Sequence, residues 1–124
     1  LLKNTTRIKY NQIPIMLTIL PETADQSSLN VYVKNDAPLT VLYFTATWCG
    51  PCKAIAPTVK AYADKYPNVN FYKIDVDALE ELTMYAGVNC MPTFQLYKGG
   101  EHVDTLEGAS AETLESMIKN KLLL

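Results

Sequence analysis

The sequence predicts an α/β fold in which a mixed central β-sheet is flanked by helices, in the order β-α-β-α-β-α-β-β-α. The run Leu39–Phe44 is almost wholly apolar and carries β-branched and aromatic residues, which is typical of a central strand buried on both faces. After Cys49 the apolar residues recur at helical spacing. A Gly-Gly pair then separates the strand-like segments Thr93–Tyr97 and His102–Leu106, which indicates an antiparallel hairpin.

The elements before residue 77 follow from local patterns. Met16–Leu20 is a short apolar strand, residues 24–35 have the spacing of a first helix, and Val69–Val76 has the pattern of a further strand. The helix that begins at Cys49 has one apolar side, formed by Ile55, Val59, Tyr62 and Tyr66. Pro57 lies within this helix and removes a backbone donor, so we expect a kink there.

Two more helices are predicted in the second half of the chain. Asp77, with Glu80 three residues later, predicts a capping-box start to a third helix, which Gly87 ends just beyond its C-cap. Ser110 can cap a last helix with a single apolar stripe, made of Leu114, Met117, Ile118 and Leu122. The early strands then join through right-handed crossovers, and the last two strands are antiparallel.

Length and composition indicate one globular domain. The chain has 124 residues, 48% of them hydrophobic and 19% charged, which suffices for a single buried core. Its net charge is −2 and it has no block of basic residues, which argues against a nucleic-acid or membrane partner and favours protein partners. Three cysteines are too few for a secreted disulfide scaffold, so we expect a cytoplasmic protein.

Residues 1–15 are expected to lie outside the fold as an N-terminal extension, either a cloning remnant or a translated leader. They carry Lys3, Arg7 and Lys9 without an acidic residue, so a mitochondrial transit peptide is the alternative to a cytoplasmic location. A signal peptide fits less well because no small-residue cleavage site follows. The domain is expected to span residues 16–124, beginning at Met16.

The motif Trp48-Cys49-Gly50-Pro51-Cys52 places two thiols one helical turn apart where the central strand gives way to a helix. Unpaired N–H groups and the positive end of the dipole make a sulfur at a helix N-terminus easier to ionise, and the thiolate is the attacking species. Cys49 is therefore the predicted nucleophile.

A zinc site, a haem site and a structural disulfide each fit the two cysteines less well than redox chemistry does. A zinc site would need two further ligands, and only Cys90 and His102 remain. A c-type haem signature needs His where Lys53 stands, and a structural disulfide across so short a loop adds little stability. We therefore expect reversible redox chemistry without a metal or cofactor.

The combined motifs resemble the thioredoxin family over residues 16–124, and so imply the thioredoxin fold. Besides the pentapeptide at residues 48–52, the matching positions are Phe44, Ala46, Lys53, Pro57, Asp75-Val76-Asp77, Met91-Pro92-Thr93-Phe94, Gly100 and Gly108. The resemblance implies a protein-disulfide reductase in which Cys49 attacks a substrate disulfide and Cys52 resolves the mixed disulfide. Gly50 and Pro51 place no histidine between the thiols, which favours a reductant over an oxidant.

The resemblance also implies partners and a substrate surface. The partners are disulfide-containing proteins and a thioredoxin reductase or equivalent electron donor. Pro92 would form a cis peptide bond beside the dithiol, with the backbone of Met91 pairing with substrate and Trp48 and Gly108 completing the surface. Read alone, Pro92 could instead begin an edge strand, and Trp48 could be simple packing.

Tyr43 departs from the family pattern, which has a buried aspartate six residues before the first cysteine. A phenol stays protonated near neutral pH and cannot replace a carboxylate base. Lys73, on the neighbouring strand, would lose its partner and must be partly neutral, reach water, or donate to the Tyr43 hydroxyl. Alternatively, Tyr43 merely fills the core and solvent takes the proton; the sequence does not name the replacement base.

Cys90 is the third thiol, two residues before Pro92. It is either a small buried hydrophobe or an exposed thiol through which an otherwise monomeric protein forms an oxidative dimer, as its Cys-Met-Pro-Thr setting in similar proteins implies. His102 is expected to be a solvated strand residue. A competing function is a non-catalytic subunit that docks a partner around Trp48 and Met91, because fold alone does not establish activity.

Overall fold

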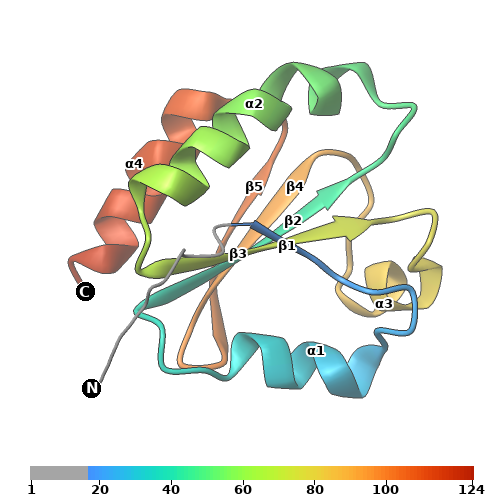
Figure 1. The fold of residues 1–124 in the computed structure, drawn as a ribbon, viewed down its shortest axis with the longest axis horizontal. Coiled ribbons are helices and arrows are strands. Elements are labelled where there is room, and N and C mark those ends of the chain that lie inside the picture. Colours follow the sequence, from blue (N-terminus) through green and yellow to red (C-terminus); the bar gives the residue numbers. More distant parts are fainter. Residues whose placement is uncertain (1–16) are drawn as a thin grey trace, which may run out of the picture.

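The computed structural model describes residues 17–124, and a five-stranded mixed sheet forms its centre (Figure 1). The strands lie in the order β1-β3-β2-β4-β5, with the bounds β1 (Leu17–Ile19), β2 (Leu39–Thr45), β3 (Val69–Asp75), β4 (Thr93–Lys98) and β5 (Glu101–Glu107). β1 and β2 each pair in parallel with β3, whereas β4 is antiparallel to both β2 and β5. The predicted element order and antiparallel last pair are confirmed. The expectations about residues 1–15 and Met16 lie outside the described residues.

Helices cover both faces of the sheet (Figure 1). α2 (Gly50–Lys65) and α4 (Ala111–Leu122) lie on one face, and α1 (Gln26–Val33) and α3 (Glu80–Tyr85) lie on the other. Each pair of helices contributes buried apolar residues to a separate core cluster. Between residues 17 and 124, no helix is both long and apolar enough to cross a membrane.

β2 is the central strand, and all seven of its residues are buried. Successive side chains of a strand point to opposite faces. Accordingly, Val41 and Tyr43 pack in the cluster beneath α2 and α4, while Leu42 and Phe44 pack in the cluster beneath α1 and α3. The strand therefore holds both cores together, and its carboxyl end leads directly into the loop before α2.

The predicted start of α3 is wrong. The helix begins at Glu80 with Leu79 as its N-cap, two residues later than the expected cap at Asp77, and Leu79 makes no side-chain capping bond. Instead Asp75 Oδ1 accepts hydrogen bonds from the backbone N–H groups of Asp77 and Ala78, at 2.9 and 3.4 Å. A short acidic side chain competes in this way with helix formation. The expected helix end is confirmed, with Gly87 at a φ of 76° just beyond the cap.

Contacts near its carboxyl end join α2 to α4. α2 continues through Pro57 to Lys65. The Glu115 carboxylate accepts hydrogen bonds from Lys65 Nζ at 2.5 Å and from the Tyr66 hydroxyl at 2.7 Å. Both bonds lower the pKa of Glu115 below its ordinary value, and the bond from Lys65 has the larger effect. These contacts hold the far end of the helix whose other end carries the dithiol.

We expect Leu114→Ala to destabilise the fold because Leu114 is completely buried between α4 and the sheet. Truncating a buried leucine leaves a cavity and costs about 2–5 kcal/mol of unfolding free energy. The matched control is Leu123→Ala, since Leu123 is 85% exposed just beyond the same helix. Urea unfolding of the oxidised proteins measures both changes, and equal effects would contradict this account of the core.

Candidate active site

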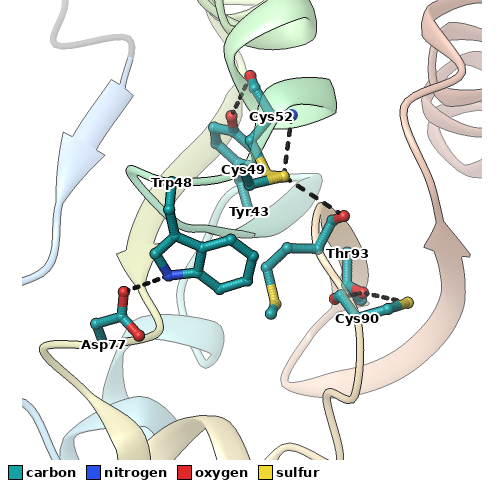
Figure 2. Close-up of a disulfide and its surroundings, with 8 residues drawn as sticks. Tyr43, Trp48, Cys49, Cys52, Asp77, Cys90 and Thr93 are labelled. Atoms are coloured by element: carbon teal, nitrogen blue, oxygen red, sulfur yellow. Dashed lines mark hydrogen bonds between the residues drawn. A yellow bond between two sulfur atoms is a disulfide. The ribbon is translucent and has the colours of Figure 1, made fainter.

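The two cysteines of the motif form a disulfide at the start of α2 (Figure 2). Cys49 is the N-cap of the helix, with an extended backbone (φ −89°, ψ 114°), and Pro51 lies in the first turn. The Cys49 sulfur accepts a hydrogen bond from the backbone N–H of Cys52 at 3.2 Å. A sulfur in this position receives a donor that the helix leaves unpaired and lies at the positive end of the dipole. The environment therefore favours a thiolate at Cys49 when the pair is reduced.

The segment before β4 reaches the same sulfur. The Cys49 Sγ lies 3.6 Å from the carbonyl oxygen of Met91, and the Met91–Pro92 peptide bond is cis, as the resemblance implies. The Pro92 carbonyl accepts a hydrogen bond from the Gly108 N–H at 2.9 Å, and Gly108 has a φ of 112° that favours glycine. The fold thus brings Met91, Pro92 and Gly108 together beside the dithiol.

Trp48 lies exposed next to the disulfide, with 65% of its surface accessible. Its indole Nε1 donates a hydrogen bond to Asp77 Oδ2 at 2.8 Å (Figure 2). Reasoning from the sequence assigns Asp77 to a helix cap and misses this contact. The contact could have been expected from the pairing of the strands. β2 and β3 are parallel, so Trp48, which follows β2, and Asp77, which follows β3, meet at the same edge of the sheet.

Tyr43 lies buried beneath the dithiol. Its hydroxyl donates a hydrogen bond to the backbone carbonyl of Cys52 at 3.5 Å, and its ring stacks on Phe94 with the ring centres 5.0 Å apart. Lys73 is its cross-strand neighbour on β3, as expected, but Lys73 is half-buried and reaches the surface. Among the hydrogen bonds of residues 17–124, the Tyr43 hydroxyl bonds to the Cys52 carbonyl and none joins it to Lys73, so of the three outcomes considered for Lys73 the structure favours access to solvent.

A cleft of about 310 Å³ opens beside these residues. Tyr43, Cys52, Lys53, Lys73 and Asp75 are among the residues that line it. Reasoning from the sequence gives Asp75 no role at the site; this residue closes β3 and pairs in register with Thr45. Polar and charged groups therefore adjoin the second cysteine of the pair even though Tyr43 replaces the family's aspartate.

Cys90 is exposed and remains outside the disulfide. Its sulfur lies 3.8 Å from the hydroxyl oxygen of Thr93, which itself donates a hydrogen bond to the Cys90 carbonyl at 2.7 Å. Of the two possibilities, a buried hydrophobe is therefore wrong. His102 is exposed on β5, as expected.

Metal ligands are not clustered in this region. Over residues 17–124, no group of three or more His, Cys, Asp or Glu side chains could hold a metal ion. The groups described at the site are the two sulfurs, the start of α2 between them, and the cleft behind Cys52.

Comparison with known proteins supports the same chemistry. A family model described as thioredoxin matches residues 21–120. Thioredoxin-1 of Schizosaccharomyces pombe is 43% identical over 104 residues, which cover 84% of this chain and 100% of the relative. A crystal structure of a Nicotiana alata thioredoxin superposes with a TM-score of 0.79 and 36% identity, covering 91% of this chain and 98% of that one.

A mitochondrial relative is also similar. The oxidised mitochondrial thioredoxin 3 of Saccharomyces cerevisiae superposes with a TM-score of 0.76 and 35% identity, covering 84% of this chain and 94% of that one. Since the family model and these relatives all match the part of the chain that holds the dithiol, the chain belongs to the thioredoxin family of oxidoreductases, which act by thiol–disulfide exchange through a redox-active cysteine pair.

Proposed function

We propose that this thioredoxin reduces disulfides in protein substrates, with Cys49 as the nucleophile and Cys52 as the resolving thiol. The observation that carries the proposal is the Cys49 sulfur at the N-cap of α2, where it accepts the Cys52 N–H and lies beside the Met91 carbonyl. The exposed Trp48 borders this sulfur. Cys52 lies in the first turn behind Cys49, at a Cα–Cα separation of 5.2 Å, within bridging distance.

The reaction transfers two electrons to the substrate. The Cys49 thiolate attacks one sulfur of the substrate disulfide, whose S–S bond breaks, and the released substrate thiolate takes up a proton. The Cys52 thiolate then attacks the Cys49 sulfur and expels the second substrate sulfur as a thiolate. The Cys49–Cys52 disulfide remains, and a thioredoxin reductase or equivalent donor returns two electrons and two protons.

The residues between the cysteines support the reducing direction. Gly50 and Pro51 carry no charge that would further stabilise the Cys49 thiolate. A thiolate that is less stabilised makes the dithiol a stronger reductant, because stabilising the reduced form makes a pair more oxidising. Gly50 also leaves open space above the first turn of α2, since a Cβ there would meet nothing within 4 Å.

Substrate binding is proposed for the surface formed by Trp48, Met91, Pro92 and Gly108. Met91 O faces the nucleophile, and the Gly108 N–H holds the Pro92 carbonyl in place. The hydrogen bond to Asp77 fixes the indole of Trp48, so an extended substrate would meet an ordered apolar wall. The backbone of Met91 would pair with that substrate.

We expect Cys52→Ser to trap substrate, because the mixed disulfide on Cys49 can then no longer be resolved. Turnover of insulin reduction, coupled to a reductase and NADPH, should be lost, and denaturing non-reducing gels should show covalent adducts. Cys49→Ser is the matched control, expected to form none. Both variants are made with Cys90→Ser, so that the third thiol cannot contribute an adduct.

A non-catalytic docking role makes the opposite prediction. If a variant with both Cys49 and Cys52 changed to serine binds its partner as well as the parent protein, and the parent reduces no disulfide, docking is the function and reduction is wrong.

For the oligomeric state we propose a monomer that forms a disulfide-linked dimer through the exposed Cys90. Peroxide would oxidise two Cys90 thiols to one intermolecular disulfide while it is reduced to water. We expect Cys90→Ser to abolish the dimer that peroxide produces in the parent protein, as measured by non-reducing gel filtration. A Cys90→Ser protein that still dimerises under peroxide would refute this assignment.

We propose that the thioredoxin domain spans residues 16–124 and that residues 1–15 are an extension outside it. A cytoplasmic location is proposed, with a mitochondrial one as the alternative if the basic N-terminal residues are native. Mapping the native start codon tests the two locations. Initiation at Met16 supports the cytoplasmic one. Initiation upstream, together with import into isolated mitochondria, supports the mitochondrial one.

A further inference from the structure

The cleft behind the dithiol lies between the first turn of α2 and the carboxyl ends of β2 and β3. Cys52 lines it but is itself only 2% exposed. The attacking form of a thiol is the thiolate, and burial disfavours the charged form. The resolving step therefore needs a group that takes the Cys52 proton within this cleft.

Tyr43 is poorly suited to that role. A neutral phenol oxygen is a weak base, and its own proton is donated to the Cys52 carbonyl, so the hydroxyl cannot pass a proton from the sulfur on to a stronger base. Lys73 and Lys53 also line the cleft, but an ammonium group has no lone pair with which to accept a proton. Among the residues that line the cleft, the carboxyl group belongs to Asp75.

The sheet places Asp75 on the correct face. Phe71 of β3 packs in the core cluster beneath α2, and side chains two residues apart share a face, so Lys73 and Asp75 face α2 as well. The register pairs Tyr43 with Lys73 and Thr45 with Asp75. Asp75 thus lies two residues beyond Lys73, the partner of Tyr43. It is nearer to the carboxyl ends of β2 and β3, where Cys52 lies.

The carboxyl group of Asp75 is also held in place. Its Oδ1 accepts hydrogen bonds from the backbone N–H groups of Asp77 and Ala78. The side-chain hydrogen bonds found for Asp75 within residues 17–124 all end on Oδ1, which leaves Oδ2 to accept from water. The cleft has room for several waters, and the Tyr43 hydroxyl and Lys73 ammonium supply further polar partners.

We propose that Asp75 is the positioning residue that accepts, through water in this cleft, the proton of Cys52 during resolution. The inference rests on the proposed reductase function. The Cys52 S–H bond breaks and its proton passes through water to the Asp75 carboxylate. The Cys52 thiolate attacks the Cys49 sulfur, a new S–S bond forms, and the substrate leaves as a thiolate. The Lys73 ammonium in the same cleft favours the negative charge as it develops on sulfur.

The test separates attack from resolution. A reduced Cys90→Ser protein is mixed in a stopped-flow instrument with dithiobis-nitrobenzoate, an aromatic disulfide that releases one coloured thiolate at attack by Cys49 and a second at resolution by Cys52. Asp75→Asn is compared in this background, because an amide oxygen still accepts the bonds from Asp77 and Ala78. Asp64→Asn, an exposed site on α2, is the control.

We expect Asp75→Asn to leave the first release unchanged and to slow the second by roughly 100-fold, at the lower end of what general-base catalysis contributes. In Asp75→Ala, formate added to the cleft should restore the second release, which a purely structural defect would not allow. The inference is overturned if the second release is as fast in Asp75→Asn as in the Asp64→Asn control, or if formate does not restore it in Asp75→Ala. Failure of the first release in the parent protein would instead contradict the reductase function itself.

Discussion

The placement of one sulfur at the N-cap of a helix governs the chemistry of this protein. Cys49 adopts an extended backbone, and its sulfur takes the place of the side-chain oxygen that commonly caps a helix, accepting the N–H of Cys52. The same hydrogen bond and the helix dipole that begin α2 also favour a negative charge on that sulfur. Helix initiation and nucleophile activation are therefore one interaction.

That interaction needs a rigid support, and β2 supplies it. The strand is buried throughout and joins both core clusters, so the residues at its carboxyl end are held firmly relative to β3 and β4. Because β3 runs parallel to β2, the acidic residues at the end of β3 reach the edge of the sheet where α2 begins. Asp77 accepts the hydrogen bond that positions Trp48 on the exposed side of the dithiol. Asp75 lines the cleft on the other side, next to Cys52.

Two sides of the disulfide consequently differ in character. The outer side presents Trp48 and the Met91 carbonyl and suits contact with an extended polypeptide. The inner side meets the Tyr43 hydroxyl and a cleft whose lining includes Lys73 and Asp75, groups that suit proton transfer from a buried thiol. This division matches the two steps of thiol–disulfide exchange, in which one sulfur must be reached by substrate and the other must be deprotonated out of its reach.

The sequence by itself determined the order of the elements, the buried central strand, the terminal hairpin and the dithiol at a helix start, because each depends on residues close together in the chain. The tertiary structure decided the bond from Trp48 to Asp77, the late start of α3, the exposure of Cys90 and the position of Asp75 at the cleft. These features depend on which strand ends share an edge and on competition for backbone N–H groups. The spacing of residues along the chain does not show which strand ends meet or which group captures a backbone N–H. The pattern around Asp77 therefore predicts a cap and gives Asp75 no role at the site.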